Sequence, residues 1–245
     1  MISINNPNII SLADAIVLIN QKNIPVIFWD TCSLIDIIRI PFPKRENHPD
    51  TDQRIIEIKN KIIAGEIISV ASSMSVKEFN DNIQGELGSF NNQLDKLSVE
   101  VNKFIGFVNK SSVVADAIPE INLVGYKLEL YYCDIAKSII DNTVFIKDEQ
   151  TFKDKAHSRL VDKIAPAKRK GEYKDCCVWE TCLQTKQAIA DKTKDWIFNS
   201  SNVTDYAGAN GLVFADDLIQ ESTDNNIKYA KDFHLARKLM TDIGL

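Results

Sequence analysis

Short, almost wholly apolar runs recur along the chain, and the longer segments between them repeat apolar residues every three or four positions. A run of four or five apolar residues is typical of a strand that is buried on both faces of a parallel sheet. The longer segments have the period of an amphipathic helix. Because predicted strands alternate with predicted helices, the pattern indicates an α/β domain with a central parallel sheet. The predicted strands are residues 26–29, 67–71, 143–146, 195–199 and 227–229.

Several of the helical segments carry start or stop signals. Ser11 and Asp14 have the spacing of a capping box at the start of the first helix. Pro41 follows the second helix and would stop it, and Gly65 is a typical residue just beyond the end of the third. The predicted helices are residues 11–20, 34–40, 54–64, 75–110, 121–141, 152–164, 175–190 and 230–242.

The longest helical stretch lies between the second and third predicted strands and is largely polar, with Pro119 dividing it into two helices. We expect a single domain over residues 1–245, with approximately residues 80–142 as a helical insertion. Four aromatic residues in this stretch have positions suited to helix packing. We predict that they belong to the core and are not platforms for base stacking. They are Phe104, Phe107, Tyr131 and Tyr132.

Composition narrows the class of protein without identifying its chemistry. The 245 residues are 44% hydrophobic and 26% charged, which is typical of a globular domain. The net charge of −5 excludes a highly basic protein that binds nucleic acid by bulk charge alone. No GxGxxG or GxxxxGK(S/T) phosphate-binding motif occurs. The three histidines are isolated in the sequence, so a histidine-based mechanism is not expected.

The sequence predicts neither export nor a membrane segment. No apolar run approaches the ~20 residues that span a bilayer. The first ten residues contain no Lys or Arg, so the charged start of a signal peptide is missing. Five cysteines, an odd number, lack disulfide-like or CxxC spacing. We therefore expect reduced thiols in a cytoplasmic protein, and the many Ile, Asn and Lys residues favour a bacterial source with an AT-rich genome.

Four acidic residues are expected at one edge of the sheet. Asp30 directly follows the first strand, and Glu78 lies in the first turns of the helix after the second. Asp175 starts a helix, and Asp205 lies a few residues beyond strand 195–199. Ligands of open parallel sheets bind beyond the carboxyl ends of the strands, where these carboxylates would converge and repel one another. Mg²⁺ or Mn²⁺ would neutralise them and activate water for phosphodiester cleavage.

Each of these acids also has a purely structural interpretation. Asp30 could cap the helix that follows it, and Glu78 could complete a capping box with Ser75. Asp175 could interact with a helix dipole, and Asp205 could be a turn residue. Each signal is weak alone, so the prediction of a metal site depends on the joint placement of all four residues.

The order of the motifs resembles that of the PIN-domain nucleases, in a larger PIN-like subgroup with long helical insertions. Residues 26–36 (VIFWDTCSLID) look like the opening strand, Asp-Thr and apolar helix of the family. Residues 75–79 (SVKEF) look like its second acidic position, and residues 170–180 (KGEYKDCCVWE) like the third. Residues 197–206 (IFNSSNVTDY) look like the last strand-and-acid motif. The resemblance covers most of the chain from about residue 25 to residue 206.

The resemblance implies a three-layer, Rossmann-like α/β/α sandwich and a metal-dependent endonuclease, most often a ribonuclease. Asp30, Glu78 and Asp175 would take the catalytic, metal-binding roles with Mg²⁺ or Mn²⁺, and Asp205 would be the fourth acid. Glu180 is five residues after Asp175 and about 140° round the helix from it. We therefore expect Glu180 to support the fold and not the metal.

Polar neighbours would support these acids. The hydroxyls of Thr31 and Ser201 would orient the carboxylates or the attacking water. The last motif offers both Asn202 and Asp205, so the residue that faces the metal is left open. Cys32 departs from the family, in which many members carry Asn at this position, and a thiol is a poorer polar partner.

A basic segment leads directly into Asp175. Eight basic and three acidic residues give residues 151–174 a charge of +5, so the other 221 residues carry −10. This segment could hold a phosphate backbone beside the acidic centre, or it could be a solvated helix face followed by a loop. The predicted nucleic-acid contacts are Lys168, Arg169, Lys170 and Lys174.

Other functions fit the sequence less well. A haloacid-dehalogenase phosphatase needs a second Asp two residues after the first, where this chain has Cys32. The main alternative is a PIN-like module that binds nucleic acid or protein without cleaving, and the presence of all four acids argues against it. The expected substrate is single-stranded or structured RNA, with DNA left open. Because small PIN nucleases are often toxins, an antitoxin or another protein regulator is the expected protein partner.

Overall fold

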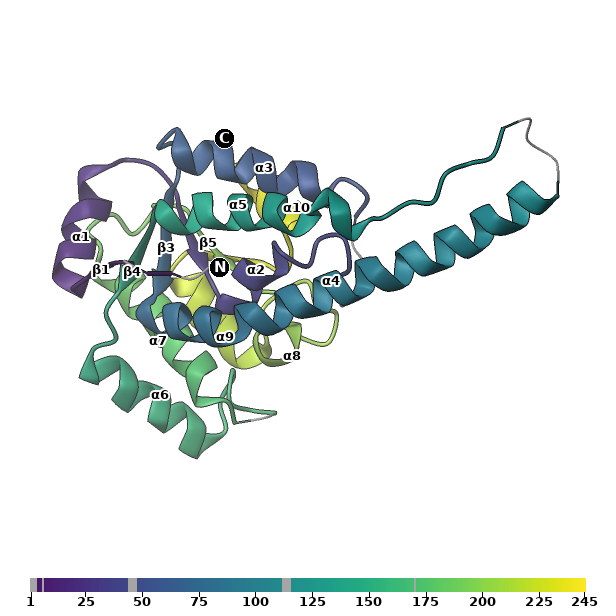
Figure 1. Cartoon of the computed structure of the whole chain (residues 1–245). Helices are drawn as coiled ribbons and strands as arrows, with labels where there is room; N and C mark the ends of the chain where they lie inside the picture. Colours follow the sequence, from purple (N-terminus) through teal and green to yellow (C-terminus); the bar gives the residue numbers. More distant parts are fainter. Residues whose placement is uncertain (1–3, 6, 44–47, 112–115, 170) are drawn as a thin grey trace.

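Six parallel strands form the central sheet (Figure 1). The computed structural model describes residues 4–5, 7–43, 48–111, 116–169 and 171–245. The strands are β1 (Asn8–Ile10), β2 (Val26–Trp29), β3 (Ile68–Ser72), β4 (Thr143–Ile146), β5 (Trp196–Asn199) and β6 (Ile227–Ala230). Their order across the sheet is β1-β4-β3-β2-β5-β6, and every neighbouring pair is parallel. The predicted α/β class with a central parallel sheet is confirmed.

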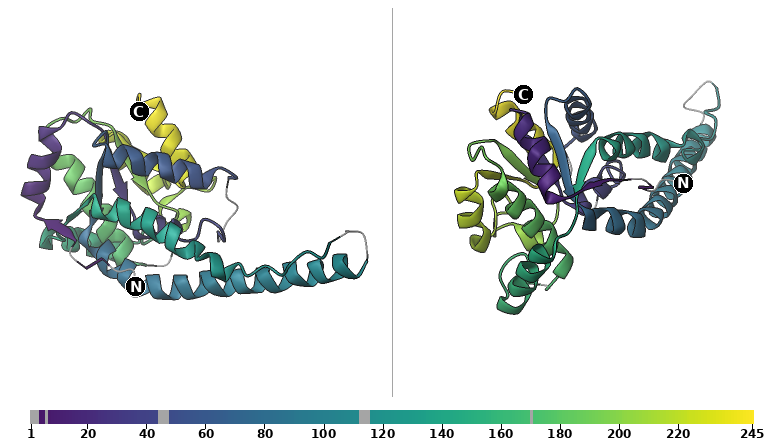
Figure 2. Two further views of the ribbon diagram at one scale, coloured as in Figure 1. Left: turned by 45° about the horizontal axis from the view of Figure 1, so that its top comes forward. Right: turned by 90° about the vertical axis from the view of Figure 1, so that its left-hand side faces the viewer.

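Helices cover both faces of this sheet. They are α1 (Leu12–Gln21), α2 (Thr31–Asp36), α3 (Thr51–Ile63), α4 (Ser73–Lys110), the 3₁₀ turn η1 (Val124–Tyr126), α5 (Leu128–Asp141), α6 (Gln150–Asp162), α7 (Tyr173–Ala188), α8 (Val203–Tyr206), α9 (Asp216–Asp224) and α10 (Phe233–Asp242). One face carries α2, α3, α4, α5 and α10, and the other carries α1, α6, α7 and α9 (Figure 2). The fold is therefore a three-layer α/β/α sandwich.

Strand β2 shows why the apolar runs predicted strands correctly. Successive side chains of a strand point to opposite faces of a sheet. Ile27 and Trp29 accordingly join the core on one face, and Val26 and Phe28 join the core on the other. All four side chains are fully buried, because a helical layer covers each face. A strand in this position needs apolar residues throughout, which is the pattern seen in the sequence.

The five predicted strands are present, with limits that differ by at most one residue, but the sequence analysis missed β1. This strand pairs with β4 at the edge of the sheet. It has three residues, of which Asn8 and Ile9 are exposed. A short edge strand that is exposed on one side does not need an apolar run, so its sequence carries little signal.

The helix predicted from residue 121 begins only at Leu128, so the prediction was wrong for the first seven residues. Residues 116–123, named here the return segment, run back along α4 without helical structure (Figure 1). Side chains of α4 satisfy their backbone groups, since Asn102 and Asn109 bond the N–H and C=O groups of Ile121 and Ile118. These hydrogen bonds replace those that a helix would make within itself.

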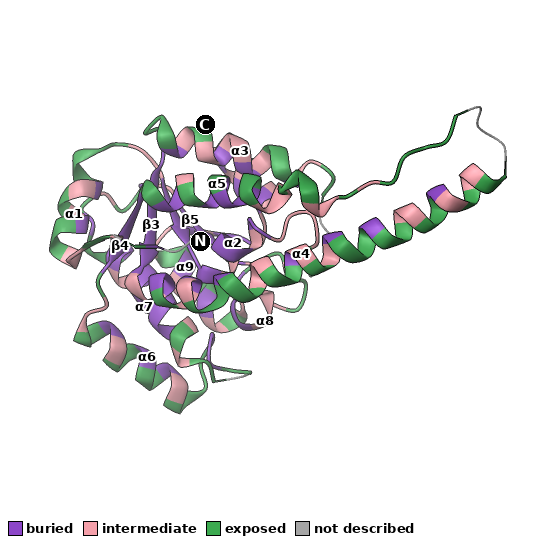
Figure 3. Cartoon of the chain, in the orientation of Figure 1, coloured by how far each residue is buried: buried purple, intermediate pink, exposed green. Residues whose placement is uncertain are grey.

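The outer half of α4 projects from the body of the protein as an arm (Figures 1 and 3). Phe104, Phe107 and Tyr131 are 69%, 60% and 47% exposed, so the prediction that they belong to the core was wrong. Tyr132 is buried as predicted. Helical spacing made these aromatic residues candidates for helix packing, but it could not show where the body of the protein ends.

No described helix is both long and apolar enough to cross a membrane. All five cysteines are free, four of them buried and Cys32 partly exposed.

Candidate functional site

The four acids predicted from the sequence line a single cleft of about 310 Å³ at the carboxyl edge of the sheet. Asp30 comes from the start of α2, Glu78 from α4, Asp175 from the first turn of α7 and Asp205 from α8. The cleft is named here the acidic cleft. Its other lining residues are Thr31, Cys32, Ile35, Arg39, Asn82, Glu172, Lys174 and Asn202.

Asp30 is buried at the junction between β2 and α2 and caps the helix. Its Oδ1 accepts a hydrogen bond from the backbone N–H of Thr31 at 2.7 Å, and α2 consequently begins three residues earlier than predicted. Burial raises the pKa of Asp30, hydrogen bonds from Cys32 and Ser200 oppose the rise, and the nearby charge of Glu78 adds to it, which gives a pKa of about 6. The capping role is therefore real, and it places the same carboxylate in the cleft.

Ser200 is a site residue that the sequence analysis missed. Its hydroxyl donates to Oδ2 of Asp30 at 2.5 Å. The pairing of β2 with β5 places Trp29 opposite Asn199, so the next residues along, Asp30 and Ser200, also lie side by side. Only knowledge of the strand order would have revealed this pair. The backbone N–H of the predicted residue Ser201 donates to another hydroxyl, and its orienting role stays a prediction.

Cys32 is a partner of Asp30 in spite of its weaker polarity. Its thiol, on the second residue of α2, donates to Oδ2 of Asp30 at 2.7 Å. Burial raises the pKa of this thiol, and the charge of Asp30 raises it further, so the thiol keeps its proton. Cys32 can therefore donate to the carboxylate, as the amide of an Asn would at this position.

The fold raises the pKa of Asp175 more than that of Asp30. Burial, followed by the charges of Asp30, Asp205 and Glu78, raises its pKa to about 8. Its Oδ2 accepts a hydrogen bond from the side-chain amide of Asn202 at 3.1 Å. Burial makes the larger contribution to the raised pKa, and the neighbouring acids add to it because the acidic residues that line the cleft outnumber the basic ones.

Asn202 and Asp205 both line the cleft but differ in their partners. The amide of Asn202 is engaged with Asp175. Asp205 is 4% exposed, and its Oδ1 is buried without a hydrogen-bond partner among the described residues. The hydroxyl of Thr31 is also buried without a hydrogen-bond partner among the described residues. A buried acceptor and a buried hydroxyl without partners are costly unless something else in the cleft binds them.

Glu78 does not belong to a capping box. The N-cap of α4 is Ser72, whose hydroxyl accepts from the N–H of Met74 at 3.1 Å. Ser75 therefore lies within the helix, and the structural interpretation of Glu78 as its capping partner was wrong. One turn beyond Glu78, Asn82 extends the polar wall of the cleft.

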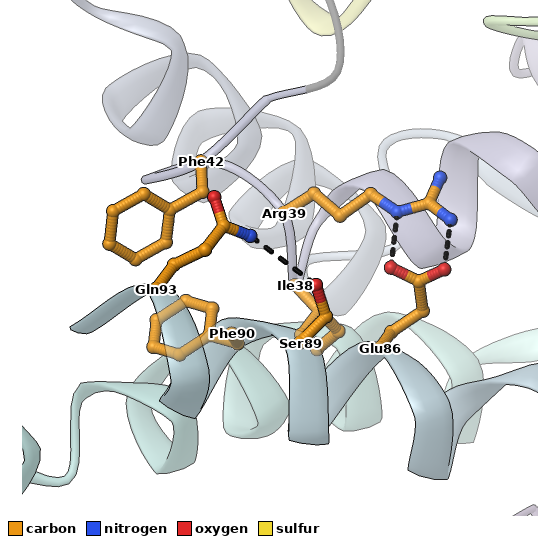
Figure 4. Close-up of a pocket in the computed structure, with 7 residues that line it drawn as sticks. All are labelled: Ile38, Arg39, Phe42, Glu86, Ser89, Phe90 and Gln93. Atoms are coloured by element: carbon orange, nitrogen blue, oxygen red, sulfur yellow. Dashed lines mark hydrogen bonds and ion pairs between the residues drawn. The ribbon is translucent and has the colours of Figure 1, made fainter. Parts of the chain in front are cut away.

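Two cationic side chains, Arg39 and Lys174, also line the cleft. Arg39 donates to Asp36 at 2.8 Å and, through its Nε, to Glu86 of α4 at 2.7 Å (Figure 4). These carboxylates fix the guanidinium at the rim of the cleft. The second interaction also joins the chain just after α2 to α4.

The other predicted nucleic-acid contacts lie away from the cleft or outside the described residues. Lys168 is exposed and pairs with Asp217 of α9 at 3.1 Å. Arg169 is exposed and does not line the cleft. Lys170 falls outside the described residues. Lys174 is thus the one of the four that the described structure brings to the acids.

Glu180 has the structural role predicted for it. It is 3% exposed and pairs with Arg159, which is itself 6% exposed, at 2.5 Å. Arg159 also donates to Glu221 at 2.6 Å, and Trp179 donates to the same carboxylate at 2.9 Å. This network joins α6, α7 and α9 away from the cleft. Because Glu180 and Arg159 are partners within it, both charged side chains can be buried.

Although the four acids share the cleft, their side chains do not meet at one point. No group of three or more His, Cys, Asp and Glu residues within the described part of the chain is arranged to hold a metal ion. Comparisons of the chain with protein-family models, with curated proteins and with solved structures give no match. The chemistry of the site is therefore interpreted from its own residues.

Proposed function

We propose that this chain is a metal-dependent, PIN-like nuclease that hydrolyses phosphodiester bonds in RNA. The observation that supports the proposal most is the presence of Asp30, Glu78, Asp175 and Asp205, from four separate elements, in one cleft. The resemblance of their sequence motifs to those of PIN-domain nucleases adds support. So does the parallel sheet, because it brings these motifs to the edge where ligands of such sheets bind.

The chemistry of the donor groups in the cleft suits a hard divalent cation, although in the described structure these groups are not gathered around one point. Carboxylate oxygens are the ligands that Mg²⁺ and Mn²⁺ prefer in proteins. Asp205 offers a buried oxygen without a hydrogen-bond partner among the described residues, and the pKa of Asp175 is raised by burial and, to a lesser extent, by the neighbouring acids. We assign Asp30, Glu78, Asp175 and Asp205 as the residues that would hold Mg²⁺ or Mn²⁺. Of the two residues left open by the sequence, we assign Asp205 to the metal and Asn202 to the orientation of Asp175.

The bound cation would supply a water of lowered pKa and stabilise negative charge on the phosphate. Around it, Ser200 and Cys32 hold the carboxylate of Asp30 in one orientation. The hydroxyl of Thr31, which has no partner among the described residues, is placed to bind a water molecule in the cleft.

Lys174 provides positive charge for a phosphate beside this acidic centre, whereas Asp36 and Glu86 neutralise the charge of Arg39. Both cationic side chains line the cleft. Asp36 and Glu86 bind all three nitrogens of the Arg39 guanidinium, which makes it a fixed part of the cleft wall. Lys174 immediately precedes Asp175 on α7 and brings a second cation close to the same acid.

The proposal is tested by incubating the full chain with single-stranded RNA and with DNA in Mn²⁺ or Mg²⁺. We expect RNA cleavage that falls at least about 100-fold in Asp30→Asn. Asp216→Asn, which changes an exposed acid in the first turn of α9, should cleave as the wild type does. Calorimetric titration with Mn²⁺ should show binding that Asp30→Asn weakens. Wild-type protein that binds Mn²⁺ and RNA but cleaves neither nucleic acid would instead support a non-cleaving binding module.

A further inference from the structure

One side of the long helix α4 runs from the acidic cleft to the outer end of the arm. Each residue of an α-helix advances about 100° around the axis and about 1.5 Å along it. Lys96 follows Glu78 by 18 residues, or about five full turns, so both side chains project from the same side of α4, about 27 Å apart. Further along the arm, three more residues lie within about 40° of this line. The four outer residues are named here the basic stripe: Lys96, Lys103, Phe107 and Lys110.

The basic stripe is open to solvent. Phe107 is 60% exposed, the three lysines are exposed as well, and none of these lysines has an ion pair or hydrogen bond with a described residue. The return segment is bonded to Ser98, Asn102 and Asn109, which lie about 120–160° around α4 from the line of the stripe. The return segment therefore supports the arm from the opposite side, and the described part of the chain leaves the stripe uncovered.

The charges of the arm are divided between its two sides. Within about 40° of the line, the outer half of α4 carries the three lysines of the stripe and one acid, Glu100, which gives a net charge of +2. Asp95 lies about 100° away from the line, and Asp116 and Glu120 belong to the return segment on the covered side. The open side would repel a second copy of itself and attract a polyanion.

An exposed, uncharged track connects the cleft with the stripe. The residues between Glu78 and Lys96 that lie within about 40° of the line are Asn82, Gly85, Ser89 and Asn92. Ser89 also lines a second pocket, of about 40 Å³, which shares Arg39 with the acidic cleft (Figure 4). A strand that leaves the cleft along this line meets no negative side chain before Lys96. A stacked strand advances about 3.4 Å per nucleotide, so about eight nucleotides span the 27 Å.

We propose that the basic stripe is a second binding site for single-stranded RNA, which holds the strand at a distance from a cleavage site in the acidic cleft. The lysines contact phosphates, and Phe107, between Lys103 and Lys110 on adjacent turns, stacks on a base. Basic and aromatic side chains arranged in this way are typical of sites that bind single strands without sequence preference. The inference rests on the proposed function, since it places the cleaved phosphodiester in the cleft. It adds that the protein prefers strands long enough to reach the arm.

Fluorescence anisotropy of the full chain in chelator, with RNAs of two lengths, tests the stripe. A strand of about 20 nucleotides reaches both the cleft and the stripe, whereas a stacked strand of about six reaches only the cleft. Replacing the three lysines of the stripe with Ala should weaken binding of the long RNA. It should also reduce the slope of log affinity against log salt by about 2, because each phosphate contact of a single strand contributes about 0.7. The matched control makes the same change in charge at three exposed lysines outside the arm and should keep the wild-type slope: Lys22, Lys137 and Lys238.

The aromatic residue of the stripe is tested separately. Phe107→Ala should weaken binding of the long RNA at least about fivefold, because it removes a stacked base, and it should leave the salt slope as in the wild type. Val161→Ala is the control, since Val161 is 65% exposed on α6, away from the arm. Helical content by circular dichroism should be the same in all these proteins.

Cleavage assays in Mn²⁺ separate this inference from the proposed function. The wild type should cleave the long RNA with a higher kcat/KM than the short RNA, and the triple lysine variant should lose this preference through a raised KM. Wild-type protein that cleaves RNA but binds both lengths equally would overturn the inference and leave the proposed function standing. A triple variant with the wild-type salt slope would also overturn it, as would a dimer that Phe107→Ala dissociates in sedimentation. Wild-type protein that binds the long RNA through the stripe but cleaves neither would contradict the proposed function and support the stripe as an RNA-binding site.

Discussion

The hydroxyl of Ser200 donates a hydrogen bond to Oδ2 of Asp30 at 2.5 Å, across 170 residues of sequence. Both residues follow central strands, β2 and β5, and the pairing of these strands brings them together. The hydrogen bond orients the most buried acid of the cleft, which is 1% exposed. The proposed metal site thus depends on a residue that is itself not an acid.

Removing this hydroxyl should weaken metal binding without unfolding the protein. We expect Ser200→Ala to lower Mn²⁺ affinity about 10- to 100-fold, because residues that orient metal ligands have effects of this size. Calorimetric titration measures the change. Ser158→Ala, which removes an exposed hydroxyl of α6 that does not line the cleft, is the control and should bind Mn²⁺ nearly as the wild type does. Equal affinities for Ser200→Ala and the wild type would show that Asp30 does not need this partner.

The metal-free protein should lose stability as pH rises. The pKa of Asp175 is about 8 in the folded chain and about 4 in an unfolded chain. Between these values the folded state holds a proton that the unfolded state has released. The stabilisation from Asp175 is therefore complete below about pH 4 and is lost as pH rises through about 8. Asp30, with a folded pKa of about 6, contributes to the same trend at lower pH.

Replacing Asp175 should remove much of the dependence of the free energy of unfolding on pH. In chelator at pH 9, we expect Asp175→Asn to exceed the wild type by about 2 kcal/mol in free energy of unfolding, with a smaller difference at pH 5. Urea denaturation at the two pH values measures this. Adding Mn²⁺ at pH 9 should stabilise the wild type more than the variant. An Asp175→Asn protein that is less stable than the wild type at pH 9 would indicate a structural role.

The ion pairs of Arg159 and Lys168 should differ sharply in their contribution to stability. Arg159→Met leaves the buried carboxylate of Glu180 without its partner and should cost about 3–5 kcal/mol. Lys168→Ala breaks an ion pair whose Lys side chain is 59% exposed and should change stability by less than about 0.5 kcal/mol. Thermal denaturation compares the two variants. Similar losses in both would contradict this division between the buried and the exposed pair.

Substrate contacts should follow the cleft and not the whole basic segment. We expect Lys174→Ala to weaken RNA binding and to reduce the slope of log affinity against log salt by about 1. Lys168→Ala should have a smaller effect, since Lys168 pairs with Asp217 outside the cleft. Fluorescence anisotropy at several salt concentrations measures both. A larger effect from Lys168→Ala than from Lys174→Ala would indicate that RNA contacts the protein on the side of α9.

The sequence predicted those features that arise from local pattern. The apolar run of β2 and the capping residue Ser11 are examples, because burial on two faces and a side-chain cap leave marks within a few residues. The four acids were also found, since each lies directly after a strand or in the first turns of a helix. Their meeting in one cleft was inferred from the edge at which parallel strands end.

Features that depend on distant parts of the chain were missed. The bond between Ser200 and Asp30 requires the strand order, which no local pattern contains. The non-helical return segment is fixed by side chains of α4, among them Asn102, about twenty residues earlier in the sequence. Phe104 has the spacing of a core residue, but α4 carries it beyond the core.

The continuous helix α4 connects the acidic cleft with the exposed arm. Its 38 residues extend about 57 Å, with Glu78 in the acidic cleft near one end and Phe104 near the other. The contact between Arg39 and Glu86 lies between them. Glu86 is about 12 Å along the helix from Glu78 and about 27 Å from Phe104. Phe90 and Leu94, between Glu86 and Phe104, are packed in the core. The body of the protein therefore holds the inner half of α4 on both sides of Glu86, and this anchorage fixes the position of a cleft carboxylate while the outer half stays free of the core.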